Sequence, residues 1–369
     1  MDSTAEMMTT PLSSCRQDSY GYDDSTPTAG DYEDYFDLMC DRAPVRAFRS
    51  WYEPPLFWTI TLVGGLGNLA VVWIYLHFRQ RLKTMTDVYL LNLAVADLLF
   101  LVTLPFWASE ASHGWSFGPG LCKLTSALYK VNLFSSVLLL TCISADRYVA
   151  IVQTTKAQNS KRERLRCSKL VCAAVWLLAA LLAAPELIFA TVKPEEEREF
   201  CRMVFFENAG NRTKILVLAL QVSMGFCLPF LIMTFCYSVI VCTLLKTRNF
   251  EKHKAMRVIL AVVVVFVLSQ LPYNGVLVME AAQATNVTNE LQCEEKKRFD
   301  VAGQVLKSLA YTHACLNPFL YAFVGVRFRR DVLRLLRAYR CLPRGMLGKP
   351  GKQRASVMSD TDTTQALSL

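Results

Sequence analysis

Charge is scarce in this sequence. Only 19% of its 369 residues are Asp, Glu, Lys or Arg, and 53% are hydrophobic, whereas soluble domains carry about 25% charged residues. Signatures of common enzymes are also missing: there is no H-E-x-x-H motif and no glycine loop that would cradle a phosphate. No internal repeat indicates the related halves of a transporter. These absences argue against a soluble domain, an enzyme and a transporter built from repeats.

The uncharged stretches are long enough to cross a bilayer. A hydrocarbon core of roughly 30 Å needs about 20 apolar residues in a helix, and helices are expected because spanning backbone must satisfy its own hydrogen bonds. Seven segments qualify: Leu56–His77, Val88–Ser109, Leu124–Val149, Leu170–Val192, Ile215–Leu245, Val258–Ala282 and Val301–Val324. We therefore predict an all-α membrane protein whose residues 51–326 form a bundle of seven transmembrane helices.

The basic residues predict the topology. The formal net charge is +9, and Lys and Arg gather in the first, third and fifth connections between spans and after the last span. The positive-inside rule places these parts in the cytoplasm, which leaves the N-terminus outside. Residues 1–50 are acidic, so we expect a disordered extracellular tail. No apolar stretch precedes Trp51, so we expect the first span to act as its own signal. This charge distribution argues against nucleic acid as a partner and makes membrane lipids the expected surroundings.

Two cytoplasmic segments should follow the last span. Residues 327–341 combine basic and apolar positions as in an amphipathic helix lying on the inner membrane surface. Cys341 at its end is a candidate palmitoylation site, and a free thiol is the alternative. Residues 342–369 should form a disordered tail, where phosphorylation would add charge that a basic adaptor could read; a simple spacer is the alternative. Its candidate phosphorylation sites are Ser356, Ser359, Thr361, Thr363, Thr364 and Ser368.

Five of the 13 cysteines fall on the predicted outside, where disulfides form. A Cys122–Cys201 bridge would hold the long connection between spans four and five over the mouth of the bundle. Cys40 and Cys293 could then join the N-terminal tail to the last outer loop, with Cys15 left over. Sequence does not decide the connectivity.

Two glycosylation motifs also fall on the predicted outside. They begin at Asn211 and Asn286.

Polar residues within the spans are candidate functional residues because a bilayer makes them costly. Asp97 lies in the middle of span two, where Asn68, Ser136 and Asn317 from other spans could surround it. This polar core predicts a Na⁺ or water network, or else a hydrogen-bond clamp between helices.

Two short motifs mark the inner ends of spans. Asp146-Arg147-Tyr148 ends span three, and such an acid–base pair can hold a closed state and then release the Arg; a positive-inside anchor is the alternative. Asn317-Pro318-x-x-Tyr321 lies near the end of span seven. Pro318 removes a backbone donor and loosens the helix, so Tyr321 could swing; a structural kink is the alternative.

In their order on successive spans, these motifs resemble the rhodopsin-class G-protein-coupled receptors over residues 45–341. Narrower motifs are similar to the CC chemokine receptors: T-L-P-F-W at 103–107, D-R-Y-V-A-I-V at 146–152 and H-A-C-L-N-P at 313–318. Within that family, F-V-L-S-Q-L-P-Y-N at 266–274 and the terminal A-L-S-L most resemble the type-nine subgroup, with type seven next.

The resemblance implies a receptor for a basic CC chemokine, with thymus-expressed chemokine suggested, and no cofactor. Sulfated Tyr20, Tyr22, Tyr32 and Tyr35 would attract the body of the ligand. The flexible N-terminus of the ligand would enter a cavity that contains Trp107, Tyr129, Tyr273 and Lys307.

Inside the cell, the resemblance implies release of Arg147 from Asp146 and inward rotation of Tyr237 and Tyr321. An inhibitory-class G protein would then bind, giving calcium mobilisation and leukocyte chemotaxis from the plasma membrane. Arrestin and receptor kinases would act on the tail. A type-seven receptor, or a scavenging receptor with weak G-protein coupling, is the alternative.

Two residues depart from the family pattern. Gln270 stands where most of the superfamily has a Trp switch, and Lys307 stands where many CC receptors have Glu. A lysine in span seven also raises the alternative of an opsin with a Schiff base. In opsins, however, that lysine is one turn nearer the N-P-x-x-Y motif, where this chain has Tyr311.

Overall fold

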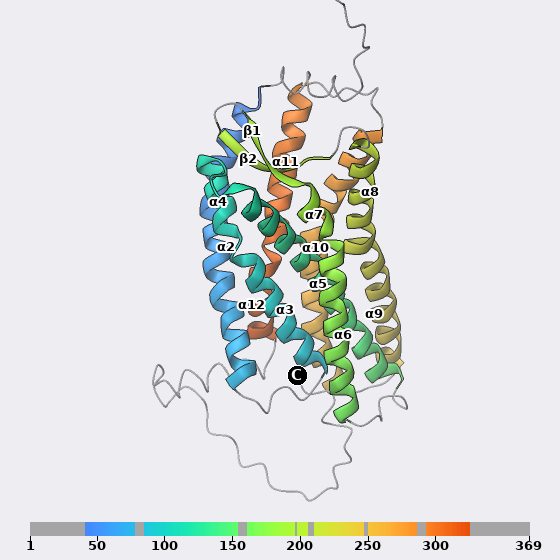
Figure 1. Ribbon diagram of the computed structural model, residues 1–369. Coiled ribbons are helices and arrows are strands. Elements are labelled where there is room, and N and C mark those ends of the chain that lie inside the picture. Colours follow the sequence, from blue (N-terminus) through green and yellow to red (C-terminus); the bar gives the residue numbers. More distant parts are fainter. Residues whose placement is uncertain are drawn as a thin grey trace, which may run out of the picture. The chain divides into compact units, whose positions relative to one another are not determined.

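The computed structural model describes residues 41–77, 85–153, 161–195, 198–205, 210–246, 250–285 and 293–324. The chain divides into two units, Met1–Asp41 and Arg42–Leu369, and the architecture below concerns the second unit. Its helices are α2 Ala43–His77, α3 Met85–Leu101, α4 Leu104–His113, α5 Gly118–Val152, α6 Lys161–Leu182, α7 Ala184–Phe189, α8 Gly210–Val222, the π-helical turn η3 Ser223–Cys227, α9 Leu228–Lys246, α10 Phe250–Thr285, α11 Cys293–Tyr311 and α12 His313–Val324 (Figure 1).

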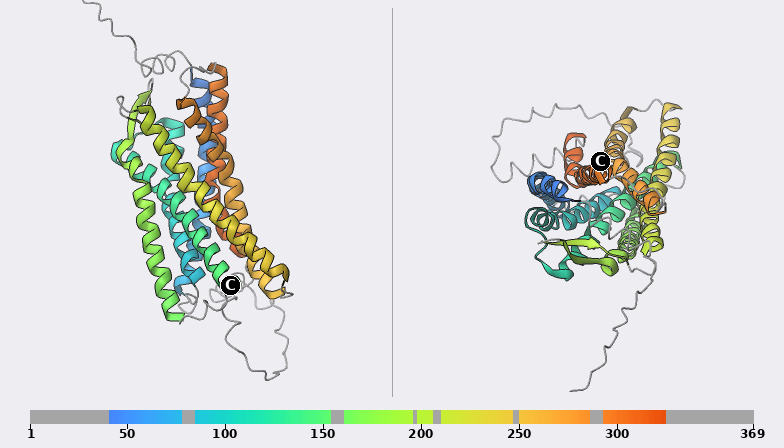
Figure 2. Two further views of the ribbon diagram at one scale, coloured as in Figure 1. Left: turned by 90° about the vertical axis from the view of Figure 1, so that its right-hand side faces the viewer. Right: turned by 90° about the horizontal axis from the view of Figure 1, so that it is seen from above.

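Six helical stretches in the described chain are long and apolar enough to cross a membrane. They are Ala43–Leu76, Met85–His113, Gly118–Val152, Glu163–Phe189, Arg212–Thr243 and Val263–Ala284, which confirms six of the predicted spans to within their ends. Seen from the side, α8, η3 and α9 follow one another as a single continuous rod (Figure 2).

The predicted seventh span, Val301–Val324, is divided between α11 and α12. α11 begins among charged residues, and α12 has only 12 residues, so neither helix alone has the length and apolarity of a span. The chain between them makes a tight turn in which the Thr312 amide donates to the Leu309 carbonyl at 3.1 Å. Span seven is therefore two helical pieces joined at Thr312.

The structure moves two predicted boundaries. α2 begins at Ala43, not at Leu56, and continues through Pro54 and Pro55. The prediction of helix over Ala190–Val192 was wrong, because the chain there forms a strand. This strand, β1 Ala190–Glu195, pairs antiparallel with β2 Arg198–Met203, with Val192 opposite Cys201. The all-α expectation therefore needs one hairpin added.

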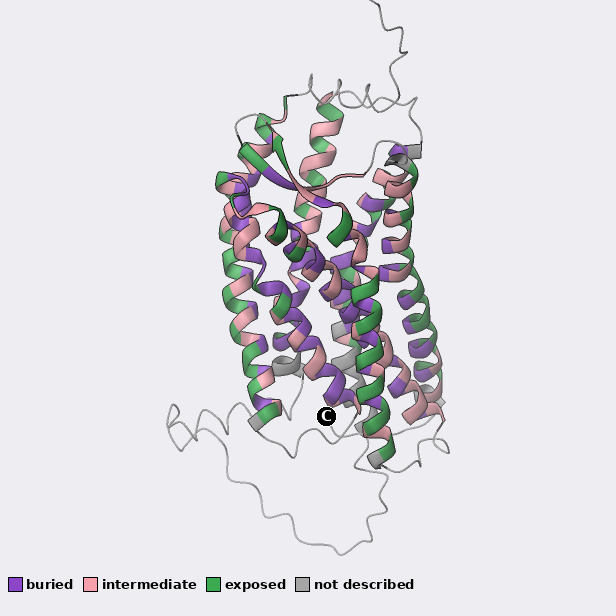
Figure 3. Cartoon of the chain, in the orientation of Figure 1, coloured by how far each residue is buried: buried purple, intermediate pink, exposed green. Residues whose placement is uncertain are grey.

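Helix α5 lies at the centre of the bundle and packs against α3, α6, α7 and α9. The buried core runs along it through Leu139, Leu140 and Ile143. Many large apolar side chains nevertheless point outward, and Leu170 is 72% exposed; Figure 3 shows exposed stretches along the outer faces of α2, α6 and α9. Exposing such large apolar surfaces to water would be energetically costly, so this pattern indicates that lipid surrounds the helices.

Helix α2 approaches α12 closely. A Cβ atom added to Gly67 would lie 2.9 Å from the Pro318 Cβ, which is too close for any side chain without movement. This contact joins the first span to the proline of the predicted N-P-x-x-Y motif.

Candidate functional site

We call the end of the bundle that carries β1 and β2 the hairpin end, and the opposite end of α5 the Arg147 end. At the hairpin end, a cluster of aromatic rings lies between the helices. Tyr129 of α5 contacts Phe100 of α3, with ring centroids 5.6 Å apart, and Tyr311 of α11, at 4.9 Å. Tyr311 and Phe100 meet edge to face at 5.0 Å. Tyr311 is therefore the meeting point of three helices, a role that sequence reasoning missed.

The other predicted pocket residues surround the same cluster. The Lys307 ammonium lies over the rings of Trp107 and Tyr311, 5.9 and 5.8 Å from their centroids, a geometry in which a cation is attracted to the ring face. Tyr273 of α10 interacts with Tyr129. The structure thus brings Trp107, Tyr129, Tyr273 and Lys307 together.

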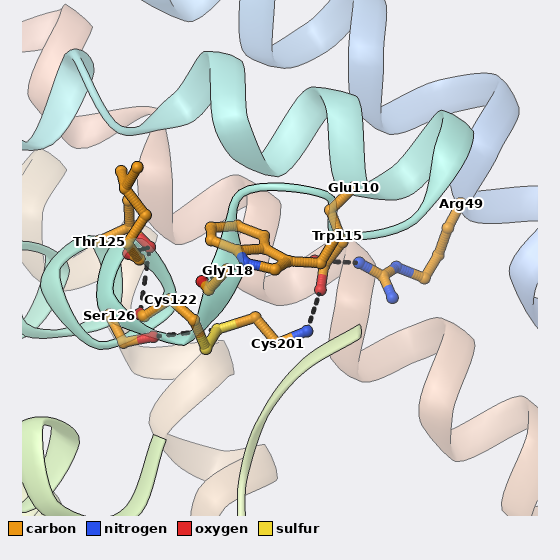
Figure 4. Close-up of a disulfide and its surroundings, with 9 residues drawn as sticks. Arg49, Glu110, Trp115, Gly118, Cys122, Thr125, Ser126 and Cys201 are labelled. Carbon is orange, nitrogen blue, oxygen red and sulfur yellow. Dashed lines mark hydrogen bonds and ion pairs between the residues drawn. A yellow bond between two sulfur atoms is a disulfide. The ribbon is translucent and has the colours of Figure 1, made fainter. Parts of the chain in front are cut away.

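The hairpin is fastened to the bundle at this end. The predicted Cys122–Cys201 disulfide is present, with Cα atoms 5.6 Å apart, and joins the start of α5 to β2 (Figure 4). Beside it, the Cys201 amide donates to a Glu110 carboxylate oxygen at 2.7 Å. The Trp115 amide donates to the Glu199 carbonyl. These contacts fix β2 across the mouth of the helix bundle.

Glu110 also belongs to an ionic network that the sequence did not reveal. Arg49 of α2 makes two hydrogen bonds of 3.1 Å to the two carboxylate oxygens of Glu53. The same guanidinium lies 3.7 Å from Glu110. All three side chains are buried. The network ties α2 to α4 and, through Glu110, to the hairpin.

A second missed network lies between α5, α7 and α8. Lys130 pairs with Glu186 at 3.4 Å and donates to the side-chain carbonyl of Gln221. The three residues line a small crevice together with apolar side chains such as Phe134. Since the three side chains occur on separate helices, no local motif indicates their contact.

The predicted polar core is present but is organised differently. Asp97 accepts hydrogen bonds from the amides of Asn132 at 3.0 Å and Asn317 at 2.8 Å. Ser136 reaches Asp97 only through Asn132, at 3.4 Å. Asn68 donates instead to the Ala314 carbonyl at 2.8 Å. Asn132, which the prediction omitted, is therefore the centre of the core.

Both Asp97 oxygens already accept amide N–H groups, which matches the hydrogen-bond clamp. The Asn132 side-chain oxygen is buried beside them without a partner in the described chain. It is a further oxygen that a water or a Na⁺ could use, so the Na⁺ site stays a prediction.

Gln270 occupies the position where a Trp switch was expected. Its buried amide donates to the Ala310 carbonyl at 3.1 Å and lies 3.2 Å from Nδ1 of His313. Phe266, one turn earlier on α10, meets the His313 ring edge to face at 5.4 Å. Gln270 therefore connects α10 to both sides of the break between α11 and α12.

At the Arg147 end, the predicted acid–base pair is closed. Arg147 donates to Asp146 at 3.0 Å, and Asp146 also accepts from Arg164 of α6 at 3.0 Å and from Thr86 of α3 at 3.1 Å. The Arg147 guanidinium also donates to the Thr86 hydroxyl. Sequence reasoning missed Thr86 and Arg164, and they join three helices at this point.

Two predicted tyrosines lie nearby. Tyr237 of α9 accepts a hydrogen bond from Ser144 at 3.2 Å, one turn from Arg147. Tyr148 contacts the Phe235 ring, with centroids 6.0 Å apart. Both tyrosines therefore lie between α5 and α9.

The remaining predicted sites fall wholly or partly outside the described residues. Cys293 is disulfide-bonded, but its predicted partner Cys40 is not described, so this pairing stays a prediction. The same holds for the amphipathic helix 327–341 and for the side chains of Tyr20, Tyr22, Tyr32, Tyr35, Asn211, Asn286, Tyr321, Cys341, Ser356, Ser359, Thr361, Thr363, Thr364 and Ser368.

Comparison with known proteins adds a family. The model described as the 7 transmembrane receptor (rhodopsin family) matches residues 67–321. C-C chemokine receptor type 9 of Mus musculus is 43% identical over 360 residues, covering 95% of this chain and 96% of that protein. C-C chemokine receptor type 7 of Homo sapiens is 44% identical over 337 residues, covering 90% and 88%. Atypical chemokine receptor 4 of Bos taurus is 41% identical over 311 residues, covering 84% and 85%.

Proposed function

Because the chain belongs to the chemokine receptors of the rhodopsin family of seven-transmembrane proteins, we propose that it binds a chemokine at its hairpin end and activates a G protein at its Arg147 end. It is a multi-pass membrane protein and, like its relatives, no enzyme. The observation that supports the proposal most is that one helix, α5, carries residues of both sites. Tyr129 belongs to the aromatic cluster at the hairpin end, and the Asp146–Arg147 pair lies at the other end of the same helix.

The ligand is a CC chemokine that binds in two steps. The acidic tail of residues 1–50, with sulfated tyrosines, lies outside the plasma membrane and attracts the basic ligand by charge. The flexible N-terminus of the ligand then enters between Trp107, Tyr129, Tyr273 and Lys307. The likeness to type 9 receptors supports thymus-expressed chemokine as the first candidate, and the likeness to type 7 receptors supports their ligands as the second.

Activation opens the Arg147 end. The ion pairs of Asp146 with Arg147 and Arg164 and its hydrogen bond from Thr86 hold α3, α5 and α6 together. The ligand must favour the state in which these contacts are broken, since equal affinity for both states shifts nothing. Arg147 then becomes available to a G protein of the inhibitory class. Calcium mobilisation and leukocyte chemotaxis follow.

A screen of the full-length receptor tests this function. Cells expressing the chain are exposed to a chemokine panel, and inhibition of cAMP and release of Ca²⁺ are measured. We expect at least one CC chemokine to give both responses, and pertussis toxin to abolish them. Chemokine uptake without either response would support a scavenging receptor, and silence of uptake and signalling alike would overturn the proposal.

The cytoplasmic tail is proposed to end the signal. Receptor kinases phosphorylate its hydroxyl groups and arrestin reads the added charge. Replacing Ser356, Ser359, Thr361, Thr363, Thr364 and Ser368 by Ala should blunt ligand-driven internalisation, measured by loss of surface label, and leave the cAMP response intact. Unchanged uptake would contradict this role of the tail.

A further inference from the structure

Two hydrogen-bond donors at the hairpin end, the Trp107 indole and the Lys307 ammonium, lack acceptors in the described chain. The indole nitrogen of Trp107 is buried and has no hydrogen-bond partner in the described chain. Lys307, which lies over the Trp107 ring, forms no ion pair with any residue that the structure describes. An indole N–H and an ammonium can only donate. Unsatisfied donors and an unpaired cation at membrane depth are costly, and such groups mark binding sites.

The neighbouring carboxylates are already engaged. Both oxygens of Glu53 accept from Arg49, and one oxygen of Glu110 accepts the Cys201 amide while the other faces Arg49. Glu186 pairs with Lys130. None of these three acids is within ion-pair distance of Lys307, so the buried charges around the cluster form their own pairs and Lys307 is left over.

We propose that the chemokine segment entering this cluster carries an acidic side chain, whose carboxylate binds Lys307 and the Trp107 indole N–H. The two groups converge because the Lys307 ammonium lies over the Trp107 ring, 5.9 Å from its centroid. A carboxylate accepts several such bonds at once, and its charge is opposite to that of Lys307. A free α-amino group in the same place would instead meet a like charge at close range.

This inference rests on the proposed function, and a double-mutant cycle tests it. The probe is the chemokine that gives a response in the panel. Each Asp or Glu in the flexible segment before its first cysteine is changed to Asn or Gln, and both forms are tested on the natural receptor and on Lys307→Gln. Lys169→Gln, a lysine on the exposed face of α6 far along the chain from this cluster, is the matched control.

We expect Lys307→Gln to lower the potency of the natural chemokine roughly 10- to 100-fold, as for a lost hydrogen bond between charged groups. One acid-to-amide change in the ligand should cause a similar loss on the natural receptor and almost none on Lys307→Gln. Trp107→Phe, which keeps a ring and removes the N–H, should weaken the response to the acidic chemokine more than to its amide form. Lys169→Gln should change neither.

Additive losses in the cycle would overturn the inference, and so would an active chemokine with no acidic residue in that segment. A shift of potency when gluconate replaces chloride, seen in the natural receptor and absent from Lys307→Gln, would show a solvent anion on Lys307 and would also overturn it. Surface label by flow cytometry verifies that each variant reaches the membrane. Should Lys307→Gln not reach it, Lys307→Met, which also removes the charge, and Trp107→Phe replace it in the same cycle.

The two proposals fail differently. Binding of a chemokine lacking its flexible segment measures the grip on the ligand body, which does not use Lys307. If that binding and G-protein activation by the full chemokine persist while the cycle is additive, the receptor function stands and the acidic-segment inference falls.

Discussion

At the scale of single residues, the Glu110 carboxylate connects three parts of the chain. It accepts the Cys201 amide of β2, faces Arg49 of α2, and is itself part of α4. Only 1% of Glu110 is exposed, so its charge is acceptable only because both partners are in place. The disulfide fixes one point of β2, and Glu110 fixes the backbone beside that point.

We therefore predict that Glu110→Ala destabilises the receptor. The Cys201 amide would remain buried without an acceptor, which costs about 1–3 kcal/mol, and Arg49 would lose one of its two acids. The apparent Tm of the detergent-solubilised receptor should fall by several degrees. Glu110→Gln keeps an oxygen that accepts the Cys201 amide, so it should lower the apparent Tm less than Glu110→Ala.

Glu163→Ala, on the exposed first turn of α6, is the control and should change the apparent Tm little. Equal values for Glu110→Ala and Glu163→Ala would show that Glu110 does not fasten the hairpin.

At the scale of elements, the first span meets the seventh at Gly67. A methyl group there would lie 2.9 Å from the Pro318 Cβ, whereas one at Gly65 would meet nothing within 4 Å. We predict that Gly67→Ala forces α2 and α12 apart and costs about 1–3 kcal/mol, as overpacking does. Gly65→Ala, on the same helix, should be neutral or slightly stabilising. The apparent Tm of the two variants measures this difference in stability. A similar Tm for both would contradict the close approach of α2 and α12.

Helices α3, α5 and α6 meet at Asp146 of α5. Thr86 of α3 and Arg164 of α6 both bind this carboxylate, so the closed arrangement involves more than the neighbouring Arg147. We predict that Thr86→Val and Arg164→Gln each raise ligand-free G-protein activation several-fold, because a lost hydrogen bond of about 0.5–1.5 kcal/mol shifts the population of the open state by that factor. Basal cAMP at matched surface expression measures the effect. Lys169→Gln should leave it unchanged, and unaltered basal activity in both variants would exclude a holding role for these contacts.

How far the sequence predicts these elements depends on the range of the interaction. Hydropathy predicts seven spans, because bilayer thickness acts on every stretch of about 20 residues, and six of them are confirmed as single apolar helical stretches. It fails at Ala190–Val192, which are apolar enough to extend span four but form β1, since pairing with β2 depends on residues further along the chain. The disulfide partners Cys122 and Cys201 could be proposed because few cysteines were expected outside.

The contacts around each site were predicted less well. Asp97 could be recognised as functional from its place in a span, but its partner Asn132 could not, because the rotation of α5 about its axis is set by packing against α3. For the same reason, the Lys130–Glu186 and Arg49–Glu110 pairs could not be predicted from the sequence. Residue type and span position give candidates, and helix rotation decides which of them meet.

At the scale of the whole molecule, the proposed function makes the two ends of the bundle report on one equilibrium. The aromatic cluster and the Asp146–Arg147 pair lie on the same helix, α5. If the chemokine and the G protein both favour the open state, thermodynamic linkage requires each to raise the affinity of the other by the same factor. Coupling of this kind is typically about 5- to 150-fold.

We predict this reciprocity for the purified full-length receptor in lipid nanodiscs. Chemokine affinity is measured with and without nucleotide-free inhibitory G protein, and G-protein affinity with and without saturating chemokine. The two factors should agree. Arg147→Gln should reduce both toward one, because without the guanidinium the G protein no longer binds the open state more tightly. The control Lys169→Gln should leave both affinity factors unchanged. Binding free energies around a closed cycle sum to zero, so unequal factors would only show that the measurements were not at equilibrium. A factor of one in both directions, for a chemokine and a G protein that each bind, would show that the two ends of the bundle do not share one equilibrium.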